Sequence, residues 1–297
     1  MRIFVTGATG FVGSAVVQDL ISAGHQVLGL ARSDAGAALL SAAGAEVHRG
    51  TLEDLDSLRK GAAAVDGVIH TGFNHDFSRM AANCELDRLA IEALGDALAG
   101  SNRPLLVTSG LALLAPGRVG TEADAAVPRT SAYPRASEAT ALALAAKGLR
   151  ASVVRLPPSV HGQGDHGFVP TLIAIAREKG QSVYIGKGVN RWPAVHRLDA
   201  ARAYRLAIEG DVTRGPFHAV AEEGVAFKNI AEVIADRLGV PLVSKSPQDA
   251  AEHFGWFAMF AALDAPASSV RSRDVLNWEP THPGLLEDIG EPGYYRT

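Results

Sequence analysis

The stretch TGATGFVG, residues 6–13, decides the fold class that this sequence predicts. A short apolar run, RIFVT, leads into it over residues 2–6, and an amphipathic stretch follows over residues 14–23. A short apolar run suits a buried strand, and the spacing of apolar residues after the glycines suits a helix. The order of strand, glycine-rich turn and helix predicts the first unit of a nucleotide-binding α/β fold.

The three glycines of this turn have separate uses. Gly7 permits the tight turn, Gly10 lets the backbone approach a pyrophosphate, and Gly13 lets the helix pack close to the strand. The N-terminus of the helix then offers N–H groups and partial positive charge to the phosphates. A glycine-rich connector with no ligand is the weaker alternative, because a strand and a helix flank the turn. We therefore predict a dinucleotide site whose loop residues are Gly7, Thr9, Gly10, Phe11, Val12 and Gly13.

The alternation of strands and helices continues through the first half of the chain. Strand patterns fall at residues 25–31, 45–49, 66–71, 104–109 and 151–156, and helix patterns at residues 34–43, 53–62, 81–99 and 135–147. Strands that alternate with helices predict right-handed crossovers and a doubly wound parallel sheet, the Rossmann fold. We assign residues 1–156 to this dinucleotide-binding core.

The regular alternation of strands and helices ends after residue 156. Residues 157–297 contain shorter elements, with expected strands at residues 182–186 and 217–221 and expected helices at residues 197–209, 227–237 and 247–261. We predict that these mixed segments complete the edge of the sheet and form a small C-terminal substrate-binding lobe. Because α/β folds bind ligands at the carboxyl ends of their strands, the substrate pocket is expected between sheet and lobe.

Composition excludes several classes of partner. The 297 residues are 47% hydrophobic and carry a net charge of -4 with no run of Lys or Arg, which speaks against nucleic acid or an anionic membrane surface. The apolar runs fall far short of the roughly 20 residues that span a bilayer. The single cysteine, Cys84, and the lack of a charged leader at the N-terminus predict a reduced cytoplasm. We expect small molecules as partners, and the sequence leaves room for a homodimer.

The end of the second strand bears on the choice of cofactor. NAD enzymes carry an acidic residue there, which binds the ribose 2′-hydroxyl. This chain reads LGLARSD over residues 28–34, with Arg32 and Ser33 at that place. A guanidinium suits a 2′-phosphate, so we predict NADP as the cofactor, with NAD less favoured. Asp34 leaves room for NAD, and an exposed Arg32 with no ligand is the alternative.

Further motifs resemble the short-chain dehydrogenase/reductase superfamily, in particular its extended NAD-dependent epimerase/dehydratase type and atypical members. The glycine turn is similar to the family's TGxxGxxG, LLVTSG to the strand with the active-site serine, and WPAVHRLDAARAY and LNWEP to later family motifs. GVIHTGF and VVRLPPSVHG are similar to two segments beside the cofactor. The resemblance implies a catalytic Ser109 and further cofactor-binding residues at Thr71, Gly72, Pro157 and Val160.

The chain departs from the family pattern at several positions. Thr51 stands where relatives carry an adenine-binding Asp, Asp87 where they carry a catalytic Asn, and His161 where they carry a Tyr. The segment SAYPRASEA, residues 131–139, aligns Tyr133 with the family's catalytic tyrosine. Ser137 replaces the lysine that the family carries four residues later.

The missing lysine weakens Tyr133 as a base. An ordinary tyrosine has a pKa near ~10, and a nearby cation lowers it by about 1–3 units. Ser137 carries no charge, and on a helix Arg135 is expected to point away from Tyr133. Pro134 is expected to place Tyr133 just outside the helix, and a packing tyrosine is the alternative. Because carbonyl reduction needs only a proton that tyrosine already holds, the sequence favours a reductase.

A histidine-containing loop is the other source of acid–base groups. The run PSVHGQGDHGF contains His161, Asp165 and His166, and we predict that His161 shares or takes over proton transfer from Tyr133. Exposed histidines without a function are the alternative. The spacing does not suit a metal site, and none is predicted. Further candidates for the pocket are His70, His75, Asp76, Asn190 and Trp192.

These features together predict an atypical NADP-dependent oxidoreductase that reduces a carbonyl or related group of a small organic substrate. One alternative is a non-catalytic NADP-binding redox sensor. The other is a sugar-nucleotide epimerase or dehydratase, which would need the tyrosine and lysine pair to oxidise an alcohol first.

Overall fold

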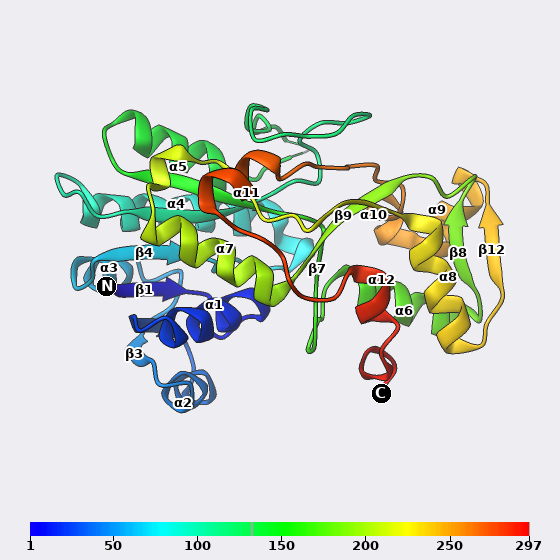
Figure 1. Ribbon diagram of the computed structural model, residues 1–297, viewed down its shortest axis with the longest axis horizontal. Helices are drawn as coiled ribbons and strands as arrows, with labels where there is room; N and C mark the ends of the chain where they lie inside the picture. Colours follow the sequence, from blue (N-terminus) through cyan, green and yellow to red (C-terminus); the bar gives the residue numbers. More distant parts are fainter. Residues whose placement is uncertain (132, 297) are drawn as a thin grey trace.

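A seven-stranded parallel sheet forms the main body of the protein (Figure 1). The computed structural model describes residues 1–131 and 133–296. The strands lie in the order β3-β2-β1-β4-β5-β6-β10, and every neighbouring pair is parallel. They span Arg2–Thr6 (β1), Gln26–Ala31 (β2), Glu46–Arg49 (β3), Gly67–His70 (β4), Leu105–Gly110 (β5), Ala151–Leu156 (β6) and Phe217–His218 (β10). The order reverses between β1 and β4, so the predicted doubly wound sheet is confirmed.

Two layers of helices cover this sheet. The helices are Phe11–Ser22 (α1), Asp34–Ala42 (α2), Leu55–Ala63 (α3), Met80–Leu98 (α4), Ser137–Ala146 (α5) and Arg197–Glu209 (α7). Strand β1 contributes side chains to both helix layers, because alternate side chains of a strand point to opposite faces of the sheet. Ile3 and Val5 pack into the core under α1 and α7, whereas Phe4 packs into the core under α3, α4 and α5.

A smaller lobe lies at one end of the sheet (Figure 1). It contains a three-stranded sheet, in the order β11-β9-β7, and the parallel pair β12-β8. Its core gathers around Trp192, Phe227 and Phe257. The strands are Ser159–His161 (β7), Ser182–Ile185 (β8), Arg191–His196 (β9), Glu222–Ala226 (β11) and Leu242–Lys245 (β12). The helices of the C-terminal half besides α7 are Phe168–Lys179 (α6), Phe227–Leu238 (α8), Pro247–Phe254 (α9), Ala258–Ala261 (α10), Val270–Leu276 (α11) and Leu285–Ile289 (α12).

Two expectations for the lobe are wrong, and the strand at Arg191–His196 (β9) was not predicted. His161 lies in β7 and not in a loop, because residues 159–161 pair with β9. The sequence run of β9 contains Pro193, a poor strand residue, and its pairing with β11 is irregular between Glu222 and Val225. The helix expected over residues 247–261 is interrupted at Gly255, whose φ is 55°.

Within residues 1–131 and 133–296, no helix combines the length and apolar character needed to cross a membrane. In the same residues, no group of three or more His, Cys, Asp or Glu side chains gathers as a metal site.

Candidate active site

The glycine turn between β1 and α1 is shaped by close backbone contacts. Gly7 has a φ of +65°, and a Cβ there would lie 2.7 Å from the backbone nitrogen of Gly72. A Cβ at Gly13 would lie 2.0 Å from the carbonyl oxygen of Gly7. Both positions therefore need glycine for packing alone, as the sequence predicted for the tight turn and the close helix.

Gly10 has a different environment. Its Cβ would meet only the Gly7 oxygen, at 3.1 Å, so the space beyond it is open. Gly10 is also the N-cap of α1, and no side chain caps this end of the helix. The first N–H groups of a helix have no partner within it, so they point out beside Gly10. Open space next to unpartnered N–H groups fits a pyrophosphate.

The end of β2 carries a free cation. Arg32 is exposed and forms no hydrogen bond or ion pair within the described residues. The Ser33 hydroxyl accepts a hydrogen bond from Gly36 N at 3.1 Å and so caps α2. Asp34 forms an exposed ion pair with Arg49 through one carboxylate oxygen. The free guanidinium of Arg32 is a group that could hold a 2′-phosphate.

The other cofactor residues predicted from the sequence lie at the ends of β4 and β6. Thr71 donates a hydrogen bond to the Thr6 carbonyl at 2.8 Å, and Gly72 N donates to the Thr6 hydroxyl at 3.3 Å. Pro157 is buried directly after β6, and Val160 lies half-buried in β7. Thr71 and Gly72 are thereby fixed beside the glycine turn.

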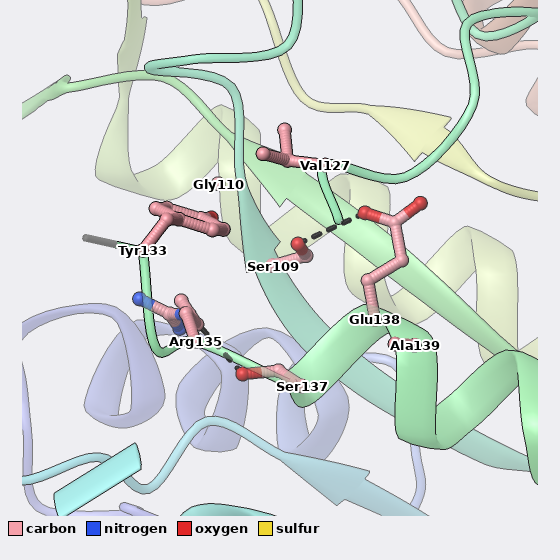
Figure 2. A pocket seen from close by; sticks show the side chains of 8 residues that line it. All are labelled: Ser109, Gly110, Val127, Tyr133, Arg135, Ser137, Glu138 and Ala139. Atoms are coloured by element: carbon pink, nitrogen blue, oxygen red, sulfur yellow. Dashed lines mark hydrogen bonds between the residues drawn. The ribbon is translucent and has the colours of Figure 1, made fainter. Parts of the chain in front are cut away.

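Ser109 and Tyr133 line one hollow near the carboxyl end of β5 (Figure 2). The hollow holds about 240 Å³ of space, including the part open to solvent. Figure 2 shows Tyr133 and Arg135 on one side, Glu138 on the other and Ser109 between them. The lining residues are Ser109, Gly110, Val127, Tyr133, Arg135, Ser137, Glu138 and Ala139.

Arg135 lies beside Tyr133, contrary to the expectation that it points away. Helix α5 begins only at Ser137, so the angular spacing of a helix does not apply to residues 133–136. The Arg135 guanidinium stands 4.5 Å from the centre of the Phe73 ring, and its Nε donates to the Ser137 hydroxyl at 3.1 Å. A cation therefore faces the hollow although the family's lysine is absent.

Ser137 connects Arg135 to a buried chain of polar groups. The Ser137 hydroxyl donates to Oδ2 of Asp87 at 2.6 Å, and Oδ1 of Asp87 lies 3.0 Å from Nε2 of His70. His70 Nδ1 in turn lies 2.8 Å from the Thr6 hydroxyl. A carboxylate only accepts, so His70 donates to Asp87 through Nε2. The chain runs from the hollow to the base of the glycine turn.

Ser109 belongs to a second buried network. Its hydroxyl donates to Oε2 of Glu138 at 3.0 Å, and Arg155 donates to Oε1 of Glu138 at 2.5 Å. Arg155 is 1% exposed, and His218 lies 3.1 Å from its Nη1. Burial lowers the pKa of His218 to about 4, so this histidine is neutral at pH 7. The sequence analysis missed Glu138, which looked like an ordinary acidic residue in the first turn of a helix.

The electrostatics of the hollow keep Tyr133 protonated. Burial raises the pKa of Tyr133, and the Arg135 guanidinium opposes that rise. Burial lowers the pKa of His75, and the positive charges of Arg135 and His166 lower it further. His75 is therefore close enough to the hollow to be affected by the same cation. At neutral pH the hollow therefore offers a phenol that can give up a proton, with a positive charge beside it.

Comparison with known proteins gives the family. The model of the family described as "NAD dependent epimerase/dehydratase family" matches residues 3–219. The chain belongs to the NAD-dependent epimerase/dehydratase family.

Two relatives and one solved structure illustrate the range of similarity. The protein C2A9.02 of Schizosaccharomyces pombe is 51% identical over 99% of this chain and 100% of its own. A 4-hydroxy-2-methyl-3-oxo-4-farnesyl-3,4-dihydroquinoline-1-oxide ketoreductase of Stigmatella aurantiaca is 31% identical over 90% of this chain and 84% of its own. The structure of DesIV, a dTDP-glucose 4,6-dehydratase of Streptomyces venezuelae with NAD and TYD bound, has a TM-score of 0.76 at 19% identity, covering 99% and 97% of the two chains. That likeness shows the fold alone.

His161 does not line the hollow of this epimerase/dehydratase-type fold. Its side chain is 0% exposed, and Nδ1 lies 2.8 Å from Oδ2 of Asp288. Nε2 has no partner among the described residues, and the ring lies edge-on to His196 with centroids 5.5 Å apart. The expectation of exposed loop histidines is therefore wrong at this position. The geometry gives no support to proton transfer by His161.

The remaining candidates have structural partners. His166 is exposed, and its ring meets the Phe11 ring edge-on at 5.7 Å. Asp76 caps the short helix at Phe77–Arg79 by accepting from Ser78 N. Asn190 donates to two backbone carbonyls of the lobe, and Trp192 is 0% exposed in its core. Asn190 and Trp192 therefore stabilise the lobe and do not line the hollow at Tyr133.

Proposed function

We propose that this protein is an NADPH-dependent reductase of a carbonyl group on a small organic substrate. One observation carries the proposal: Tyr133, Ser109 and Arg135 line the same hollow. The names of similar proteins support this class of reaction. They include the ketoreductase above and a 2-alkyl-3-oxoalkanoate reductase of Stenotrophomonas maltophilia at 27% identity.

The protonated form of Tyr133 suits the reductive direction. When bound, the reduced nicotinamide supplies a hydride to the carbonyl carbon. Tyr133 donates its phenolic proton to the carbonyl oxygen, and the product is an alcohol. Arg135 stabilises the phenolate that remains, since a positive charge beside it favours the ionised form. Oxidation of an alcohol would need the phenolate first, and burial of Tyr133 opposes that form.

The glycine turn and β2 bind the cofactor in this proposal. The N-terminus of α1 holds the pyrophosphate beside Gly10, and Arg32 holds the 2′-phosphate. Thr71, Gly72, Pro157 and Val160 are the expected neighbours of the cofactor on the β4 and β6 side. These assignments support NADP over NAD because Arg32 is free and Asp34 is paired with Arg49.

A screen of reduced-cofactor consumption tests the function. NADPH is mixed with a panel of ketones and aldehydes, and the rate with wild-type protein is compared with that of Tyr133→Phe. Loss of a general acid is expected to lower turnover by about 100-fold or more. Tyr184→Phe is the matched control, because Tyr184 lies in β8 of the lobe. Tight NADPH binding without consumption by any compound would instead favour the redox sensor.

A further inference from the structure

The hydroxyl hydrogen of Ser109 forms a hydrogen bond within the protein and is not available to a substrate. Ser109 Oγ lies 3.0 Å from Oε2 of Glu138, and all the atoms of this contact are buried. Arg155 holds the same carboxylate through Nε, at 3.1 Å from each oxygen, and through Nη2 at 2.5 Å from Oε1. Arg155 is itself fixed by the Asp124 carbonyl at 2.8 Å. The carboxylate therefore stays in place as the partner of Ser109.

This geometry settles which group donates. A carboxylate has only acceptor positions, so the hydrogen in the contact comes from Ser109. A serine has one O–H hydrogen and two lone pairs, which leaves Ser109 with acceptor capacity toward the hollow. Turning the hydrogen toward a neutral carbonyl would exchange a charge-assisted bond for a weaker one. It would also leave a buried Glu138 oxygen without that donor.

On the opposite side of the hollow, the Tyr133 side chain offers a donor hydrogen. The Tyr133 hydroxyl forms no hydrogen bond with the residues that the structure describes, so its hydrogen is available. Arg135 adds only donors and positive charge to that side. A carbonyl oxygen suits the Tyr133 and Arg135 side, whereas the Ser109 side suits a group that can donate (Figure 2).

We propose that the substrate is a hydroxy carbonyl compound, whose hydroxyl lies within two carbons of the carbonyl and donates a hydrogen bond to Ser109. This inference rests on the proposed reductase function. The short spacing is inferred because Ser109 and Tyr133 line the same hollow, with no other element between them in its lining. Hydride addition to the carbonyl carbon and proton transfer from Tyr133 to its oxygen then give a 1,2- or 1,3-diol.

A set of three matched ketones tests the hydroxyl. The compounds are 3-hydroxybutan-2-one, 3-methoxybutan-2-one, which accepts but does not donate, and butan-2-one. Wild-type kcat/KM is expected to favour the hydroxy ketone over both others by about two- to tenfold, the effect of one net hydrogen bond. Ser109→Ala should lower kcat/KM more for the hydroxy ketone than for butan-2-one, so that the ratio of the two values falls to near one. Ser109→Thr keeps a hydroxyl and should restore the preference.

Two results would overturn the inference. One is an equal loss for all three ketones in Ser109→Ala, which would mean that Ser109 donates to the reacting oxygen. The other is equal reduction of hydroxy and plain ketones by wild-type protein, which would leave the reductase proposal intact.

A binding measurement separates this inference from the reductase proposal. Butane-2,3-diol and butan-2-ol are titrated calorimetrically into full-length protein loaded with oxidised cofactor, so no turnover is needed. Tighter binding of the diol that disappears in Ser109→Ala supports the acceptor role of Ser109, even if no ketone is reduced. Equal affinities for the diol and the mono-alcohol in wild-type protein would overturn it.

Discussion

Arg135 places a positive charge beside the hollow, and in the proposed function this charge takes the part of the family's lysine. Its place depends on where α5 begins, and Ser137 is the first helical residue. The sequence showed that Pro134 would disturb the backbone at Tyr133. It did not show that Arg135 also lies outside the helix and is held by Ser137 and Phe73. Side-chain direction in an irregular segment comes from such tertiary contacts, which a local pattern does not contain.

Arg135→Gln is predicted to slow reduction and to shift its pH dependence. The guanidinium lowers the Tyr133 pKa, so its removal should raise that pKa further and weaken the phenol as an acid. We expect kcat to fall at least about tenfold, because an opposite charge shifts a pKa by about 1–3 units. The alkaline limb of the pH profile, where Tyr133 loses its proton, should move to higher pH.

The matched control for this variant is Arg129→Gln. Arg129 lies in the same segment and pairs with Glu85 at the surface. Equal pH profiles for Arg135→Gln and wild-type protein would contradict the role of Arg135.

Arg32→Ala is predicted to remove a preference for NADPH. Wild-type protein should bind NADPH at least several-fold more tightly than NADH, because a free guanidinium matches the 2′-phosphate. Fluorescence titration of both cofactors measures the ratio, and Arg59→Ala on α3 serves as the control. A wild-type protein that binds both cofactors equally, or prefers NADH, would refute the assignment.

At the scale of elements, most strands of the Rossmann half could be predicted from the sequence, whereas most strands of the lobe could not. The apolar runs of β1, β2, β4, β5 and β6 are short, buried on both faces and separated by helices, so the pattern is regular. The strands of the lobe are defined by pairing between distant segments. Residues 159–161 form a strand only because β9 lies beside them, and His161 was misplaced for that reason.

Substitutions of the two glycines are predicted to affect different properties, the stability of the fold at Gly13 and cofactor binding at Gly10. Gly13→Ala should lower the free energy of unfolding by about 1–3 kcal/mol, because its Cβ overlaps the Gly7 carbonyl oxygen. Gly10→Ala should cost less, because its Cβ lies 3.1 Å from that oxygen with open space beyond. Gly10→Val should nevertheless abolish NADPH binding by filling the space of the pyrophosphate. Denaturant unfolding and cofactor titration measure the two effects, and normal NADPH binding by folded Gly10→Val would disprove the cofactor site.

At the scale of the whole molecule, histidines and carboxylates gather where the lobe meets the main body. His161 pairs with Asp288, and His282 stacks on His196 at 4.7 Å and binds Asp199 at 2.9 Å. Burial lowers the pKa of His196 to about 4. The predicted cytoplasmic location and homodimer concern the molecule at this scale, and both stay predictions.

Stability is predicted to fall as the pH drops from about 6.5 to about 4. The pKa values of His196 and His218 are each lowered to about 4 in the folded state, so the unfolded chain takes up protons first. Asp165 acts in the opposite sense, since burial raises its pKa to about 6 and the folded state takes up that proton first. Asp165→Asn should therefore steepen the fall, and His218→Gln should flatten it. Unfolding free energies measured across this pH range would contradict the account if His218→Gln left the slope unchanged.

Transfer of a labelled hydride tests the central claim most directly. Wild-type protein and Tyr133→Phe are mixed with NADPH carrying deuterium on the transferable position of the nicotinamide, together with 3-hydroxybutan-2-one. The account predicts deuterium on the new carbinol carbon of the diol, formed about 100-fold or more slowly by Tyr133→Phe. Tight NADPH binding with no deuterium in any product, for this ketone and for the wider carbonyl panel, would contradict it.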